Sequence, residues 1–453
     1  MDQTTVRMLN ESTTSFWRQE RHSRSMSLLP ALDHAFSFVK PEHPLSAFVR
    51  HARALIQADP CSEAIRHVTG GEQGVTTRTL LKWQSGELRW FYFLLESKAT
   101  EKPIADRALT IFYRPKKHRL ELRVFPQDPY LPAIPAYLEQ VLGNGHGGPK
   151  AHDFTVLRYV PQRRLTYRIP DAGNSGRFRI GKFVRQAELD SAYDKLGRVS
   201  AAVRQQRPSF TVSTPLGMDE TYGAFYQSCL AGQNLADLIQ GDNFEELLFA
   251  VGSIHAEIHR LDVPGVPRCQ SDSIREELQE RVAVISYLCP EVAPFLDEVR
   301  ALIEKQAPNV SPEAWTFCHG DFGCNQIMKD GDHWSVVDFD GCRYGDRYRE
   351  IARLLAFLKH NVPFFYWSYH DPALDAETIL DRACAAYLRG YQQHSNGAMA
   401  WKRLSWYQLA SEVHYLARTL QRDLFVHAVG FERTIQHIEK LTAQVKNAHA
   451  KNW

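Results

Sequence analysis

The sequence lacks the features that mark several large classes of protein. No run approaches the roughly 20 consecutive apolar residues of a membrane span, and its first thirty residues carry charges where a secretory signal is apolar. Its 54 basic and 52 acidic residues nearly cancel, which leaves a net charge of +2 and no general attraction for nucleic acid or an anionic membrane. We therefore expect a cytoplasmic protein that binds neither nucleic acid nor membrane.

The eight cysteines are scattered and form no CxxC pair. The chain is too long to depend on disulfides for its stability, so we expect reduced thiols and no zinc site. The motifs G-x-S-x-G and H-E-x-x-H are also absent, which argues against a serine hydrolase and a zinc peptidase. His255 and His259 lie four residues apart, and we interpret them as a packed helix face rather than a metal site.

The chain is long enough to hold more than one hydrophobic core, since single cores stop growing at about 250–300 residues. The turn-rich run 143–149 predicts a boundary between units. Residues 1–40 form an N-terminal segment, and residues 41–148 are predicted to form a small α+β cap domain. Its predicted elements are a helix over 45–56 and strands over 76–83, 88–97, 107–114 and 118–125.

Beyond the boundary, the pattern changes from strand-rich over 150–231 to mostly helical over 232–453. The predicted strands of the first part are 153–159, 164–169, 177–184 and 222–229, with one helix over 187–203. The predicted helices of the second part are 244–261, 274–285, 293–306, 348–359, 376–394, 401–424 and 431–447. One strand-like stretch, 315–340, interrupts these helices.

The stretch 315–340 carries the chemistry. An apolar strand enters the polar loop His319-Gly320-Asp321, and a hairpin with Asp330-Gly331 at its turn follows. Because a hairpin brings its ends together, Gln326 is expected near Asp338. Carboxylate and amide oxygens suit Mg²⁺, and Asp321 on the same loop could deprotonate an acceptor hydroxyl during phosphoryl transfer.

His319-Gly320-Asp321 followed by Val337-Asp338-Phe339-Asp340 resembles the signature of the aminoglycoside phosphotransferase and choline kinase superfamily. The resemblance covers about residues 153–425 and implies an α+β, bilobal protein-kinase-like fold with a β-rich N-lobe and a helical C-lobe. It implies that Asp321 is the catalytic base and that Asp338 and Gln326 bind the metal. The superfamily usually has Asn where this chain has Gln326, so a one-residue shift that lets Asn325 bind instead stays open.

Other residues fall in the order that the resemblance implies. Lys182, inside an apolar strand, resembles the lysine that holds the nucleotide α- and β-phosphates, with Glu188 as its favoured acidic partner; Asp190 and Asp194 are alternatives. The backbone at Ser228 and Leu230 resembles the interlobe hinge that binds adenine.

Three further features complete the predicted site. Asp340 could bind a second metal ion or form a salt bridge with a neighbouring arginine. The segment Val160-Pro161-Gln162-Arg163-Arg164 replaces a glycine-rich phosphate loop, and an arginine in it could contact phosphate. Glu350 occupies the position of a downstream acidic residue, usually Asp, in the superfamily.

The prediction is an ATP- and Mg²⁺-dependent small-molecule kinase, monomeric or homodimeric, whose acceptor is a hydroxyl of a sugar or aminoglycoside-like compound. A choline or amino-alcohol kinase is the alternative, with Glu412 and Asp423 as candidates for recognising a cation. A catalytically weak pseudokinase that acts as a nucleotide-binding regulatory module also stays open. The cap resembles the layout of maltokinase-like members, and a protein-binding role for it is a further possibility.

Overall fold

The computed structural model describes residues 46, 49, 50, 53, 75–84, 87–97, 108–114, 119–143, 154–171, 177–239, 243–268, 273–367, 376–395, 397–422 and 427–450. The predicted segment 1–40 and the residues that follow Gly143 at the predicted boundary lie outside this range. Of the predicted helix 45–56, the four described residues are helical.

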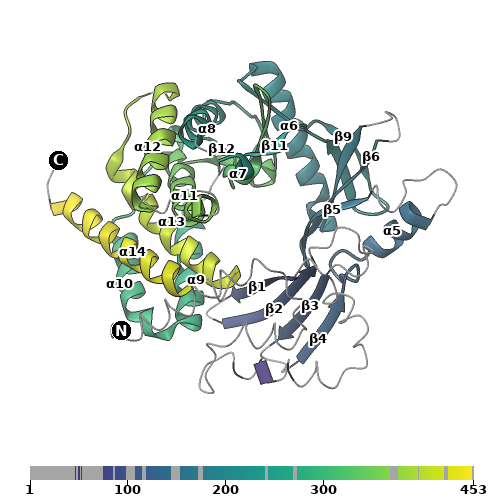
Figure 1. Ribbon diagram of the computed structural model, residues 1–453, viewed down its shortest axis with the longest axis horizontal. Helices are drawn as coiled ribbons and strands as arrows, with labels where there is room; N and C mark the ends of the chain where they lie inside the picture. Colours follow the sequence, from purple (N-terminus) through teal and green to yellow (C-terminus); the bar gives the residue numbers. More distant parts are fainter. Residues whose placement is uncertain are drawn as a thin grey trace.

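The first sheet is an antiparallel meander of four strands in the order β1-β2-β3-β4. Its strands are β1 (Val75–Gln84), β2 (Glu87–Ser97), β3 (Ala108–Arg114) and β4 (Arg119–Val124). Each matches a predicted strand to within about two residues at either end. In Figure 1 this sheet lies at the bottom of the molecule, where β1 contacts α9 (Ser273–Leu288) and α13 (Trp401–Arg422).

The second sheet is the N-lobe and has the strand order β5-β6-β7-β10-β9. Its strands are β5 (Thr155–Val160), β6 (Arg164–Pro170), β7 (Phe178–Val184), β10 (Ala224–Ser228) and β9 (Pro215–Asp219). Side chains alternate between its faces. Phe183 faces a core that includes α5 (Ile134–Gly143), whereas Val184 packs with Phe225 and the start of α6 (Leu189–Gln206) on the other face.

The end of the predicted cap range packs directly on the N-lobe. Ile134 and Tyr137 of α5 share one core with Tyr167, and Asp128 accepts hydrogen bonds from the Tyr159 hydroxyl at 3.0 Å and the Gln162 amide at 2.6 Å. The chain boundary near residue 150 therefore does not separate two independent cores, although the domain limits themselves stay a prediction.

Short strands that the sequence pattern did not reveal join the two lobes. β8 (Phe210–Val212) pairs in parallel with β14 (His333–Val336), so an N-lobe segment extends the hairpin of β13 and β14 into the sheet β11-β13-β14-β8. The remaining strands are β11 (Gln233–Asn234), β13 (Ile327–Asp330), β12 (Thr316–Cys318) and β15 (Arg343–Gly345), and β12 pairs with β15. The prediction of a single strand-like stretch in the C-lobe was therefore incomplete.

The C-lobe helices surround the largest core and confirm the predicted helical part. They are α7 (Leu235–Leu238), α8 (Phe244–Ile258), α9, α10 (Ala293–Lys305), α11 (Arg347–Trp367), α12 (Ala376–His394), α13 and α14 (His427–Ala450). In Figure 1 these helices, coloured from teal for α7 and α8 to yellow for α14, lie mostly on the other side of the molecule from the N-lobe strands β5, β6 and β9. The architecture is the predicted α+β fold with two lobes. None of the described helices has an apolar stretch long enough to cross a membrane.

Candidate active site

The loop His319-Gly320-Asp321 follows β12 and is fixed by backbone contacts on both sides. Gly320 has φ of 95°, and a Cβ added there would overlap the Gly341 carbonyl oxygen, so only glycine fits without displacement. The Gly320 amide donates to Glu350 Oε1 at 2.5 Å, and Arg353 donates to the Gly320 carbonyl oxygen at 3.3 Å. These contacts set the direction in which the chain enters Asp321.

His319 is fully buried and connects the two acidic segments of the site. Its Nε2 lies 2.9 Å from the carbonyl oxygen of Val337, the neighbour of Asp338, and its Nδ1 accepts from the Asp321 amide at 3.4 Å. Both ring nitrogens are thereby used to hold backbone, which indicates a structural role for this histidine rather than proton transfer.

Four charged side chains meet where the N-lobe sheet faces the end of the hairpin formed by β13 and β14. Lys182 Nζ lies 2.9 Å from Asp338 Oδ1 and 3.0 Å from Asp340 Oδ1. Arg164 binds the same two carboxylates, at 3.2 Å to Asp338 and 3.0 Å to Asp340. We call these four residues the charged cluster. Arg164 of β6 and Lys182 of β7 thus face two carboxylates that lie more than 150 positions further along the chain.

Mutual attraction in the charged cluster outweighs the cost of its burial. Burial alone would raise the pKa of Asp338, but the charges of Lys182 and Arg164 hold that pKa below its ordinary range. Burial alone would lower the pKa of Lys182, and the two carboxylates raise it instead. Asp338 is therefore ionised and Lys182 protonated at neutral pH. Asp338 also has φ of 70°, an unusual conformation for a non-glycine residue, which is common at functional sites.

The residues of the charged cluster and its hairpin fit a hard divalent cation. One ammonium group already bridges Asp338 and Asp340, so both carboxylates reach a single point. Gln326 precedes β13, and its carbonyl oxygen accepts from the Val337 amide at 2.9 Å, which places it beside Asp338 as the hairpin predicted. The donor set is all oxygen, as Mg²⁺ requires. Asn325 is exposed, and its carbonyl oxygen is bound by Asn234 at 2.9 Å.

Asp321 lies beside this cluster on the exposed side of the loop. Its carboxylate contributes to the raised pKa values of both Arg164 and Arg353, for which burial is the larger and opposing effect. Asp321 therefore acts electrostatically on the charged cluster and on Arg353, which together with Gly320 and other residues lines a cavity of about 370 Å³.

Other predicted binding residues are placed differently from the expectation. Glu188 is half exposed and faces Arg185 at 3.8 Å, and Asp194 pairs with Arg198 at 2.6 Å, so neither contacts Lys182. The charged residue of α6 that reaches the site is instead basic: the Lys195 ammonium donates to the Asp340 carbonyl oxygen at 3.2 Å. The acidic partners of Lys182 come from the hairpin end and not from the helix.

The predicted hinge connects β10 to β11. The Ser228 amide donates to the Thr214 carbonyl oxygen at 2.9 Å, so an adenine contact at Ser228 would have to use its carbonyl oxygen. Leu230 follows β10 in the connection that leads to β11. Adenine binding at these two residues stays a prediction.

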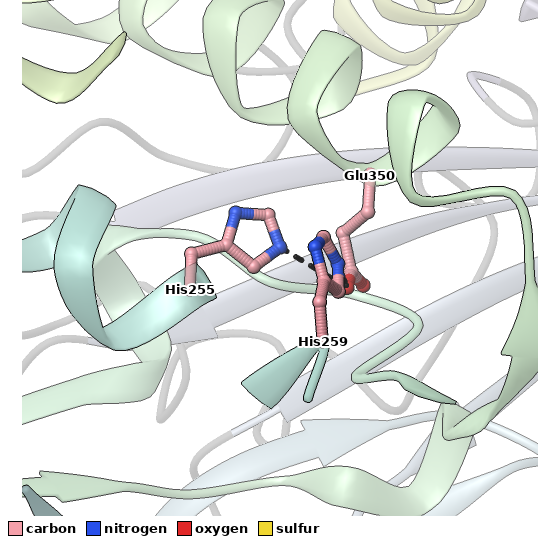
Figure 2. Close-up of side chains that lie close together, drawn as sticks. All are labelled: His255, His259 and Glu350. Carbon is pink, nitrogen blue, oxygen red and sulfur yellow. Dashed lines mark hydrogen bonds and ion pairs between the residues drawn. The ribbon is translucent and has the colours of Figure 1, made fainter. Parts of the chain in front are cut away.

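Glu350, whose burial the sequence did not reveal, is the centre of a hydrogen-bond network behind the catalytic loop. As Figure 2 shows, His255 and His259 converge on its carboxylate, with Nε2 atoms 3.2 Å and 3.1 Å from Oε2. Their Nδ1 atoms lie 2.7 Å and 2.8 Å from the hydroxyls of Tyr387 and Tyr391. Since an ionised carboxylate only accepts, both Nε2 atoms donate, and both Nδ1 atoms accept from tyrosine.

This network explains the paired histidines without a metal ion. The three ligand-type groups lie within 4.8 Å of one another, close enough to hold a cation. Every ring nitrogen already has a hydrogen-bond partner, however, and a cation would have to displace the protons between histidine and glutamate. Burial lowers the pKa of His255 to about 3, so this ring is neutral at physiological pH. The network positions the loop, because Glu350 also accepts from the amides of His319 and Gly320.

Arg164 and Glu350 are the site residues whose importance the sequence understated. Arg164 begins β6, in the segment that replaces a glycine-rich loop, and its ion pairs depend on strand order alone. Glu350 begins α11, where the helix dipole is a sufficient reason for an acidic residue. Only the contacts of Glu350 with His255, His259 and the loop amides reveal that it supports the loop.

The chain is similar to a known protein family and to several solved structures. The phosphotransferase enzyme family matches residues 162–407, more than half of the chain. Among solved structures, the amicoumacin kinase hAmiN in complex with AMP-PNP and Ca²⁺ is 14% identical, with coverage of 65% of this chain and 88% of that chain and a TM-score of 0.43. No curated protein sequence matches.

Two further solved structures are similarly distant. A thermostable mutant of the aminoglycoside phosphotransferase APH(4)-Ia is 16% identical, over 69% of this chain and all of that chain, with a TM-score of 0.43. A choline/ethanolamine kinase family protein from Mesorhizobium loti is 13% identical, over 69% of this chain and 92% of that chain, with a TM-score of 0.41.

Proposed function

Because the chain belongs to the phosphotransferase enzyme family, we propose that it is an ATP- and Mg²⁺-dependent kinase that phosphorylates a hydroxyl group of a small sugar-like or aminoglycoside-like acceptor. The observation that carries this proposal is the charged cluster beside Asp321. Two cations from the N-lobe sheet and two carboxylates at the end of the hairpin gather next to a loop that carries a further carboxylate. Phosphoryl transfer requires this combination of charge and positioning.

Each side chain has a defined task in the proposed reaction. Lys182 and Arg164 bind the oxygens of the nucleotide phosphates, and Asp338, Asp340 and Gln326 would hold the metal ion. Mg²⁺ bound there supplies positive charge against the phosphate oxygens. Asp321 orients the acceptor hydroxyl and takes its proton as the oxygen forms a bond to the γ-phosphorus. The bond from the γ-phosphorus to the bridging oxygen breaks, and ADP leaves with that electron pair.

A Mg²⁺-dependent ATP-consumption screen across sugars, aminoglycosides and amino alcohols tests the proposal. We expect turnover with at least one acceptor, a fall of at least about 100-fold in kcat for Asp321→Asn, and a comparable loss for Asp338→Asn. Asp381→Asn is the matched control, because Asp381 is exposed on α12, outside the charged cluster.

Two results would count against this function. Turnover that survives Asp321→Asn with every acceptor would exclude Asp321 as the base. Thermal stabilisation by MgATP without turnover of any acceptor would instead indicate a nucleotide-binding regulatory module.

A further inference from the structure

The cavity beside the catalytic loop has the size and position of an acceptor site. Its volume of about 370 Å³ lies within the range of about 300–1,000 Å³ usual for small-molecule sites. Gly320, the neighbour of Asp321, forms part of its wall, as do the start of α11 and side chains of α9 and α13. A molecule in this cavity would lie next to the proposed base.

The wall of this cavity is rich in arginine. Its charged lining residues are Arg275, Arg343, Arg349, Arg353, Asp346 and Glu350. Both carboxylates are already engaged: Glu350 accepts from the histidines and loop amides, and Asp346 binds Arg403 and accepts from the Tyr348 amide at 3.0 Å. Neither acid is left to attract a cationic ligand.

The arginines divide into two pairs. Arg349 and Arg353 both bind the carboxylate of Glu277, with Arg353 at 2.7 Å. Arg275 and Arg343 form no ion pair or side-chain hydrogen bond with any other residue in the described part of the chain. Even when the outer partners Glu277 and Arg403 and the neighbouring Asp321 are included, five arginines face four carboxylates. The cavity therefore carries excess positive charge.

Strand pairing fixes the position of Arg343. It lies directly opposite Cys318 in the β12–β15 pair, three residues before Asp321, and Cys318 lines the same cavity. The Arg343 side chain is half-buried, which strengthens its interaction with an anion relative to a fully solvated arginine. A guanidinium group so placed can bind a carboxylate or phosphate through two parallel hydrogen bonds.

We propose that the acceptor of this kinase carries an anionic group, a carboxylate or a phosphate, in addition to its hydroxyl, and that Arg343 binds that group with Arg275 in support. This inference rests on the proposed function and specifies its substrate class. It also replaces the expectation that Glu412 attracts a cationic acceptor. Glu412 is 2% exposed, binds His360 at 3.0 Å, and does not line the cavity.

Matched acceptor pairs test the inference. The turnover of gluconate is compared with that of glucose, and glycerate with glycerol; glucose 6-phosphate distinguishes a phosphate from a carboxylate. Choline and kanamycin represent cationic acceptors. We expect the kcat/KM of at least one anionic acceptor to exceed that of its neutral counterpart by at least tenfold. Arg343→Gln should raise the KM for that acceptor about 10- to 100-fold while kcat changes little. Arg260→Gln, at an exposed residue outside the cavity, should change neither constant.

The outcomes separate this inference from the function on which it rests. The inference is overturned if neutral or cationic acceptors are turned over as well as anionic ones and Arg343→Gln leaves this turnover unchanged. If that turnover still depends on Asp321, the kinase function remains intact. Absence of turnover with every acceptor overturns the kinase function.

Calorimetry tests the anion site separately from catalysis. Gluconate or glucose 6-phosphate is titrated into the Asp321→Asn variant in the presence of AMP-PNP. Binding that Arg343→Gln abolishes supports the site, and no binding of either anion overturns it.

Discussion

At the scale of single residues, Glu350 links the support of the active site to the loop that carries the proposed base. One carboxylate accepts from two histidine rings and from two successive loop amides. Burial alone would raise its pKa, but the hydrogen bonds from His255 and His259 hold that pKa well below its ordinary range. An ionised group with this many donors determines the loop conformation more strongly than a neutral one, because hydrogen bonds to charged groups are worth about 1.5–3 kcal/mol each.

Glu350→Gln is the test at this scale. The amide has one acceptor oxygen, and its NH₂ group faces donors, so at least one of the four hydrogen bonds is lost. We expect a loss of stability of about 2 kcal/mol or more. The kcat should fall at least tenfold with little change in the KM for ATP, since no side chain of the charged cluster contacts Glu350 directly.

The matched control is Glu439→Gln, which changes an exposed glutamate of α14 and should leave both quantities unchanged. A variant that loses stability but keeps its kcat would show that Glu350 supports the fold and not the loop geometry.

At the scale of elements, the close approach of α8 and α12 makes the network possible. A Cβ added at Gly252 would overlap the Tyr387 carbonyl oxygen, and one at Gly390 would overlap the Phe249 carbonyl oxygen. Glycine on both helices lets the backbones approach until the tyrosine hydroxyls reach the histidine rings. The close packing of α8 and α12 thus determines the hydrogen-bond geometry around Glu350, which lies on α11.

Gly390→Ala should separate these helices. Overpacking costs typically about 1–3 kcal/mol, which exceeds the roughly 1 kcal/mol by which alanine favours a helix over glycine. We therefore expect a net decrease in the free energy of unfolding, measured with urea, together with lower activity.

Gly197→Ala provides the comparison, because Gly197 lies within α6 and a Cβ there would meet nothing within 4 Å. That substitution should stabilise the protein by up to about 1 kcal/mol. Equal effects of the two substitutions would contradict the packing argument.

At the scale of the whole molecule, buried neutral histidines should make the fold sensitive to acid. Burial lowers the pKa of His255 to about 3 and those of His414 and His437 to about 4. Between these values and the ordinary histidine pKa of about 6.5, the unfolded chain binds more protons than the folded one. These histidines therefore do not lower the free energy of unfolding above about pH 6.5. Below that pH, the free energy of unfolding falls as the pH is lowered towards 3.

Removing one of these histidines should reduce the acid sensitivity. Each such group contributes a slope of about 1.4 kcal/mol per pH unit in this range. His255→Gln should lower the slope of unfolding free energy against pH between 4 and 6 by about that amount, whatever its effect on absolute stability. His333→Gln, at an exposed hairpin residue, should leave the slope unchanged. An unaltered slope in His255→Gln would mean that this ring becomes protonated in the folded state.

The sequence by itself determined the elements and the order of the chemical groups. Hydrophobic periodicity predicted the strands of both sheets, except β9, and the long helices to within a few residues at most ends, because those patterns are local. The hairpin turn at Asp330-Gly331 likewise predicted that Gln326 and Asp338 lie together, and the structure brings them side by side. The strands β8, β9, β11 and β15 escaped prediction because they are too short to show a period.

Only the tertiary structure decided which distant groups share the site. No local pattern distinguishes Arg164 from a surface arginine, or Glu350 from an acidic residue that stabilises a helix start. Sheet order gives Lys182 its carboxylate partners from the hairpin, where sequence reasoning had favoured Glu188. The charge of the cavity depends on which acids are already paired, and pairing is a property of packing between α9, α11 and α13. Long-range contacts of this kind leave no periodic trace in the chain, because each is made by single residues whose separation along the sequence is arbitrary.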